Sequence, residues 1–88
     1  MNRTRFTIMT DNDELIKKLK EDGIPIIQNN EFVYTSIVAV CAEVRLCDFI
    51  AKCAEETKAN IAVHIFYQDP CGESSGGIMY FIEGKAVS

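Results

Sequence analysis

Four cysteines and one histidine are the side chains best suited to metal binding or nucleophilic chemistry. They are Cys41, Cys47, Cys53, Cys71 and His64. Structural zinc sites use Cys or His pairs that are two to four residues apart, whereas the first three cysteines follow one another at intervals of six. Six residues turn a helix by about 600°, so such cysteines point about 120° apart. We therefore expect free thiols, no metal site and a structural role for the lone histidine.

Cys71 lies in a polar stretch of the chain and is the candidate for thiol chemistry. A reactive cysteine needs a thiolate that is stabilised by a cation, a histidine or a helix N-terminus. The charged neighbours of Cys71 are Asp69 and Glu73, which oppose thiolate formation. A surface thiol in a turn is the simpler interpretation, and a thiol-dependent enzyme using Cys71 stays as an alternative.

The segment 69–77 contains three glycines and two serines between two apolar segments. A phosphate-binding loop places such glycines before a helix N-terminus, whereas this segment joins two predicted strands. We expect a nine-residue polar loop, and long loops often carry function. The candidate binding residues are Asp69, Cys71, Glu73, Ser74 and Ser75.

The elements that position these residues follow from hydrophobic periodicity. Alternation of apolar and polar residues predicts strands, and apolar residues three or four apart predict helices. The predicted strands are Arg3–Met9, Ile24–Gln28, Glu31–Ala42, Asn60–Tyr67 and Ile78–Glu83, and the predicted helices are Asp11–Asp22 and Arg45–Lys58. An alternative is one long helix over Ser36–Lys58, because alanines near its start suit a helix.

Local signals set some of the boundaries. Asp11 is a suitable N-cap, with Glu14 three residues later as in a capping box, and Gly23 suits the end of this helix. Asn29 and Asn30 can supply the two positive φ angles of a tight hairpin turn.

This order of elements resembles the ferredoxin-like split βαβ fold, βαββαβ, with an appended C-terminal strand and two helices on one face. The fold class is α+β, and residues 1–88 form a single domain. The resemblance lies in element order alone, and this fold hosts many unrelated functions, so it implies none of them.

Composition and charge reduce the number of partner classes that we expect. The N-terminal sequence contains no apolar run of signal-peptide or membrane length, so we expect a cytoplasmic protein and no membrane partner. A net charge of −4 disfavours nucleic acid. The basic cluster 17–20 is interleaved with carboxylates and is typical of an ordinary solvated helix face.

No catalytic triad, paired carboxylates or cofactor fingerprint is present in the sequence, so we expect no cofactor and favour a non-catalytic module over an enzyme. Such a module would act by self-association or by binding another protein. A small-ligand-binding regulatory domain is one alternative. Size and charge are also similar to those of phage-encoded inhibitors such as anti-CRISPR proteins, so a small acidic phage-type inhibitor is another.

The last predicted strand has neither a charge nor a proline over Ile78–Ile82. An exposed edge of this kind is an aggregation hazard, so the strand should be central or paired with a second copy. We predict a homodimer, although residues 83–85 could instead fold back as a cover. The predicted interface residues are Ile78, Tyr80, Phe81 and Ile82.

Overall fold

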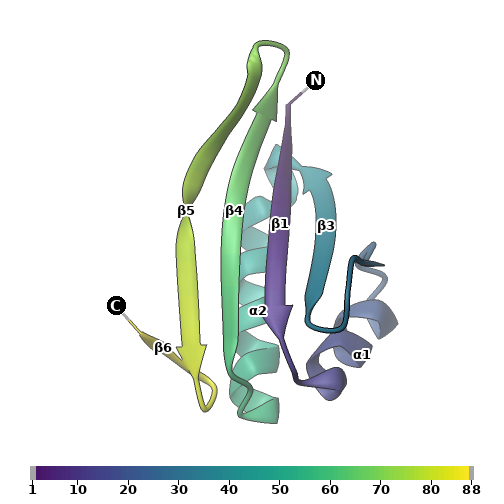
Figure 1. Ribbon diagram of the computed structural model, residues 1–88, viewed down its shortest axis with the longest axis vertical. Coiled ribbons are helices and arrows are strands. Elements are labelled where there is room, and N and C mark those ends of the chain that lie inside the picture. The colour runs from purple at the N-terminus through teal and green to yellow at the C-terminus, as the bar shows by residue number, and fades with distance from the viewer. Residues whose placement is uncertain (1, 88) are drawn as a thin grey trace.

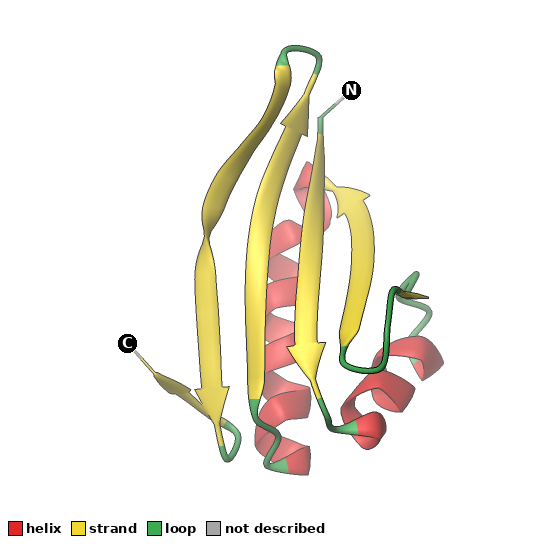
Figure 2. Ribbon diagram, in the orientation of Figure 1, coloured by secondary structure: helices red, strands yellow, loops and turns green. Residues whose placement is uncertain are grey.

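Six strands and two helices make up the computed structural model, which describes residues 2–87 (Figure 1). In chain order the elements are β1 Arg3–Thr10, α1 Asp13–Glu21, β2 Ile27–Gln28, β3 Val33–Ala39, a 3-10 turn Val40–Ala42, α2 Glu43–Thr57, β4 Ile61–Asp69, β5 Gly72–Ile82 and β6 Lys85–Val87. The strands form one antiparallel sheet in the order β2-β3-β1-β4-β5-β6. Both helices cover the same face of the sheet (Figure 2). The α+β class is confirmed, with six strands instead of the predicted five.

The N-cap of helix α1 lies one residue later than predicted. The Asn12 side-chain oxygen accepts a hydrogen bond from the Leu15 N–H at 2.9 Å, so Asn12 and not Asp11 is the N-cap. Gly23 follows the helix with a φ of +85° and ends it as predicted. The next amide, of Ile24, donates to the Leu19 carbonyl at 3.1 Å, a pattern that satisfies carbonyls at a helix C-terminus.

Helix α2 is separate from β3, so the alternative of one long helix from Ser36 is wrong. Tyr34 and Ser36 are buried at a two-residue period on β3, and this pattern requires an extended chain. The chain turns through Val40–Ala42 before α2 begins. At the other end, Lys58 adopts a left-handed conformation with a φ of +53° and caps the helix.

The turn between β2 and β3 is wider than predicted. The positive φ values among the described non-glycine residues belong to Lys58 and Glu83, so Asn29 and Asn30 do not form the predicted two-residue turn. Instead, the Asn30 side-chain oxygen accepts hydrogen bonds from the Phe32 and Val33 amides. The side-chain bonds therefore hold a four-residue loop over residues 29–32.

Strands β4 and β5 form a long hairpin, and the prediction of a nine-residue loop is wrong. Only Pro70 and Cys71 lie between the strands, and the Asp69 side chain accepts a hydrogen bond from the Cys71 amide at 2.8 Å. Gly76 is left unpaired where the register shifts, which makes a β-bulge. The tip of this hairpin reaches beyond the rest of the sheet (Figure 1).

The C-terminal residues fold back onto β5, as the sequence alternative proposed. Glu83 and Gly84 turn the chain with φ values of +51° and +83°. Strand β6 then pairs with Tyr80–Ile82, so the end of β5 is covered within the chain.

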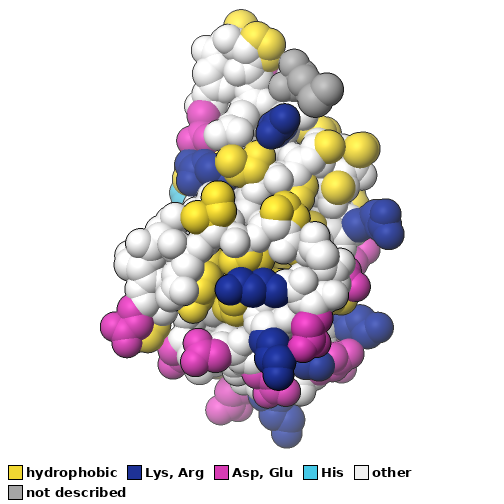
Figure 3. Space-filling model, turned by 90° about the vertical axis from the view of Figure 1, so that its right-hand side faces the viewer, with side chains coloured by type: hydrophobic (Ala, Val, Ile, Leu, Met, Phe, Trp, Pro, Cys, Tyr) yellow, Lys and Arg dark blue, Asp and Glu magenta, His cyan; other side chains and the backbone are white. Residues whose placement is uncertain are grey.

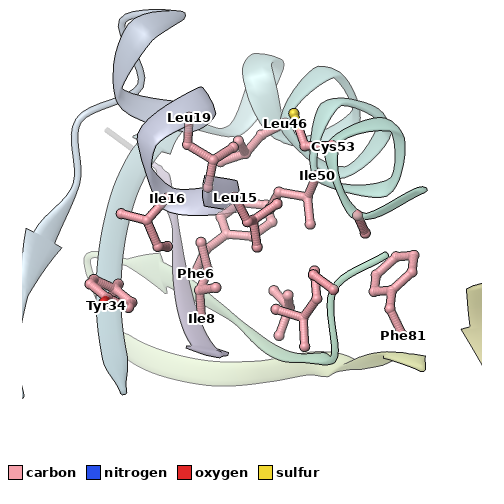
Figure 4. Packing of buried hydrophobic residues seen from close by; sticks show 14 of the residues in the cluster. Phe6, Ile8, Leu15, Ile16, Leu19, Tyr34, Leu46, Ile50, Cys53 and Phe81 are labelled. Atoms are coloured by element: carbon pink, nitrogen blue, oxygen red, sulfur yellow. The ribbon is translucent and has the colours of Figure 1, made fainter. Parts of the chain in front are cut away.

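The core lies between the sheet and the two helices (Figure 4). Leu15 and Leu19 from α1 and Ile50 from α2 are fully buried against Phe6 from β1. These inward positions leave the opposite side of the sheet without a helical layer.

Candidate functional site

The face of the sheet opposite the helices is the candidate site, and we call it the open face. Strand register arranges most of its side chains in four rows across the strands, and Ile82 and Lys85 pair in a short fifth row beside the apolar row. The apolar row is Val33, Met9, Ala62, Tyr80 and Val87. The second row is Ile27, Thr35, Thr7, His64 and Ile78. The third row is Ile37, Arg5, Phe66 and Ser75, and the charged row is Ala39, Arg3, Gln68 and Glu73.

Exposed hydrophobic side chains gather on the open face. Of the ten large ones that are exposed among residues 2–87, seven lie on this face. The seven are Met9, Ile27, Ile37, Ile78, Tyr80, Ile82 and Val87. Contiguous exposed apolar surface marks an interaction site more often than scattered residues do.

An ion pair anchors the polar half of the open face. The Arg5 Nη2 and Nε atoms donate to the two carboxylate oxygens of Glu73 at 2.7 and 3.1 Å. Gln68 donates to the same carboxylate at 2.9 Å, and the Arg5 guanidinium lies 4.2 Å from the centre of the Phe66 ring. The hydrogen bonds from Arg5 and then Gln68 lower the pKa of Glu73, and the bond to Glu73 raises the pKa of Arg5.

His64 extends this network. Its ring centre lies 3.9 Å from that of Phe66, and its Nε2 is 3.0 Å from the Ser75 hydroxyl oxygen. A serine beside a histidine can act as a nucleophile when a third group orients the base. Among the described residues, no hydrogen bond supplies such a third group to His64, so this pair is explained as part of the polar network.

The structure separates the predicted loop residues. Glu73 and Ser75 join the open-face network, because alternate residues of β5 point to this face. Asp69 and Cys71 lie at the exposed hairpin tip. Ser74 pairs with Tyr67 on the other face of the hairpin.

The four predicted interface residues divide in the same way. Ile78, Tyr80 and Ile82 are exposed on the open face, whereas Phe81 is only 5% exposed and packs in the core. The sequence interpretation missed Arg5 and Phe66 as site residues. Period-two alternation along β4 could have placed Phe66 on this face, but the partners of Arg5 depend on strand order.

The cysteines and acidic residues offer little for metal or thiol chemistry. All four cysteines are free thiols, and burial raises the pKa of Cys47 and Cys53. Within residues 2–87, no group of three or more His, Cys, Asp or Glu side chains is placed to hold a metal ion. No helix in this range is long and apolar enough to cross a membrane.

Two grooves lie on the helical side. One, of about 540 Å³, lies between α1 and the edge of the sheet, with Lys17 and Lys20 among its lining residues. Figure 3 shows the edge of the molecule that carries α1 and β3, where charged side chains of both signs gather at the lower end. The other, of about 350 Å³, is lined mainly by apolar side chains, including Val38, Leu46 and Phe49, and by the charged Asp22 and Arg45.

Comparison with known proteins gives no relative: no family model matches the chain, and no curated protein or solved structure is significantly similar to it.

Proposed function

We propose that this chain is a non-catalytic protein-interaction module that binds its partner through the open face. The observation that supports this proposal is the gathering of exposed hydrophobic side chains on one side of the sheet. Because the helices bury the other side, the open face is the apolar surface that binding can still cover. Such burial is a main favourable contribution to most protein associations.

We further propose that the frame of this module is the ferredoxin-like split βαβ arrangement. The order β2-β3-β1-β4 supports it, because β3 lies between the strands that α1 connects. Likewise, β1 lies between the strands that α2 connects. Strands β5 and β6 are then additions at the β4 edge that widen the open face.

The polar network also favours binding over chemistry. Arg5, Gln68 and Glu73 form one hydrogen-bonded group on the surface of the sheet, and His64 and Ser75 form a second. Pre-arranged polar groups of this kind give an interface orientation and specificity. The four free thiols support a reducing, cytoplasmic setting for this module.

Single-stranded nucleic acid is a rival occupant, since aromatic rings beside arginines suit base stacking. Glu73 neutralises Arg5, however, and the whole chain has a net charge of −4. Phe66 also already lies against both Arg5 and His64. These contacts favour a protein surface as the partner.

The test is to express the tagged chain in the organism from which its sequence comes and to quantify the proteins that co-purify with it, including untagged copies of the chain. Ile78→Glu places a charge on the open face and should abolish the recovery of the partner. Val44→Glu adds the same charge to a helix side chain that is 70% exposed, so it should leave recovery unchanged. If no protein co-purifies with the wild type, or if the same proteins also co-purify with the Ile78→Glu variant, the proposed function fails.

A small-ligand regulatory domain is the second candidate, and the groove of about 350 Å³ favours it. This volume lies in the range of ligand pockets, which are lined mostly by apolar groups with a few polar ones. Arg45 is the group that could bind an acidic ligand there. A thermal-shift screen of small carboxylates, compared between the wild type and Arg45→Gln, tests this function.

The remaining alternatives receive less support. A phage-type inhibitor would be the same kind of module with another protein as its target, and the co-purification experiment would identify that target. A thiol enzyme would use Cys71 at the exposed hairpin tip, where the Asp69 carboxylate accepts a hydrogen bond from the Cys71 backbone amide. Reactive thiols have a cation, a histidine or a helix N-terminus beside them, and the tip residues 69–72 include neither a cation nor a histidine.

A further inference from the structure

We infer that the occupant of the open face is a second copy of this chain, packed face to face about a two-fold axis that runs along β4. This inference deepens the proposed function and rests on it. The size of the face, the order of the rows and the position of the charges support it.

The open face is large enough for a stable dimer. The molecule measures 37 × 28 × 23 Å, and the sheet extends across its two longer dimensions (Figure 1). The six strands together contain 40 residues. At about 3.3 Å per residue and about 4.8 Å between strands, they give a flat projection of roughly 600 Å². Side-chain relief increases this area toward the roughly 800 Å² that each partner buries in a standard interface.

The row order selects the direction of the axis. An axis across the strands would place the apolar row of one copy over the charged row of the other. That arrangement would bury charges without partners, which is strongly unfavourable. An axis along the strands places each row against the same row of the other copy. The order of the strands within that row is then reversed between the two copies.

Strand β4 is the middle strand of the apolar row, so the axis lies over Ala62. The reversal then brings Met9 of each copy against Tyr80 of the other. Ala62 meets its own counterpart, and its small side chain leaves room for these larger neighbours. Two sheets about 10 Å apart interdigitate side chains in this way.

The same axis pairs opposite charges. Arg3 on β1 and Glu73 on β5 flank β4 in the charged row, so each Arg3 meets the Glu73 of the other copy. The described ion pairs join Arg5 to Glu73 and Lys18 to Glu56, which leaves Arg3 available for an intermolecular pair. A carboxylate can accept from two guanidinium groups at once.

Pairing through the sheet edge is less favourable than this arrangement. Strand β6 already covers Tyr80–Ile82, and the Gly76 bulge interrupts the rest of the β5 edge. Bulges are a recognised protection against pairing between edges.

Sedimentation equilibrium of the full chain, from micromolar to hundreds of micromolar, tests the inference. The wild type should reach twice the 9.9 kDa mass of the chain. Met9→Lys and Tyr80→Glu each bury an unpaired charge and should weaken dimerisation by about 100-fold or more. An equal mixture of these two variants should dimerise again, because one contact gains an ion pair and the other remains wild type.

Matched controls keep this test interpretable. Val44→Glu should dimerise like the wild type, and circular dichroism should show every variant to be folded. If Tyr80→Glu does not fold, Ile78→Glu replaces it as the variant that should be monomeric. A mixture of Tyr80→Glu with Tyr80→Lys should stay monomeric, because the axis does not bring these two positions together.

Three results would overturn the inference: a wild type that stays monomeric at hundreds of micromolar, dimers that survive both single variants, or folded variants whose mixture does not dimerise. If the chain is monomeric but another protein co-purifies with the wild type and not with the Ile78→Glu variant, the proposed function stands and the second copy is excluded.

Discussion

Two buried hydroxyl groups, of Thr4 and Ser36, have no hydrogen-bond partner among the described residues. They lie on β1 and β3, on the face that the helices cover, and are 0% and 1% exposed. An unpaired hydroxyl in the core costs about 1–3 kcal/mol of stability. Substitution of these hydroxyl groups therefore offers a direct test of the core packing.

We expect Thr4→Val to raise the free energy of unfolding by about 1 kcal/mol, because it removes a desolvated hydroxyl and keeps the side-chain shape. Thr10→Val is the matched control on the same strand and face. The Thr10 hydroxyl donates to the Asn60 carbonyl and accepts from the Asn12 amide, so its loss should destabilise the protein. Urea denaturation measures both changes, and a Thr4→Val variant no more stable than Thr10→Val would contradict this account.

The Arg5–Glu73 pair predicts a change in stability with pH. Because folding lowers the pKa of Glu73, its stabilising effect is complete above the unfolded pKa and is lost as pH falls through the folded one. The stability difference between the wild type and Glu73→Gln should therefore shrink below about pH 4, the ordinary range of a carboxyl group. Arg5→Gln should remove the same part of the pH profile in denaturation curves. A difference that stays constant down to the acid transition would exclude this role.

At the scale of elements, the β5–β6 turn packs directly against α2. A Cβ atom at Gly84 would lie 2.6 Å from the Ala54 carbonyl oxygen, and the Gly84 φ is +83°. Gly23 has a similar φ of +85° but nothing within 4 Å of that position. The two glycines therefore separate the cost of the backbone conformation from the cost of a clash.

We expect Gly23→Ala to cost about 1–2 kcal/mol, which is the penalty for a left-handed alanine. Gly84→Ala should cost more, because the turn must also move away from α2. Hydrogen exchange should then show faster exchange in β6 and in the end of β5. Equal destabilisation by the two substitutions would show that the contact with Ala54 contributes nothing.

The helices and the regular strands could be predicted because their apolar residues recur at one clear period. The first half of β5 could not, because the Gly–Ser composition of residues 72–77 is typical of a loop. It becomes a strand because β4 offers it a full set of backbone partners. Tertiary pairing overrides local propensity in this way, particularly in sheets.

The open face is a property of the whole molecule, so the sequence predicted only part of it. Ile78, Tyr80 and Glu73 were candidates from local patterns alone. Their assembly with Arg5, which is 68 residues from Glu73, requires the complete strand order. The apolar row likewise draws one residue from each of five strands. No short segment of the sequence contains all the residues of such a row.

Unfolding of the whole molecule should be a single cooperative transition, because both helices pack on one core against one sheet and neither has a core of its own.

If two copies associate through their open faces, the melting temperature should also rise with protein concentration, since the dimer is linked to folding by mass action. Tyr80→Glu should keep the single transition and lose the concentration dependence, whereas Val44→Glu should keep both. Differential scanning calorimetry over a wide concentration range measures the two effects together. Two resolved peaks would exclude the single core, and a wild-type melting temperature that does not change with concentration would exclude the dimer.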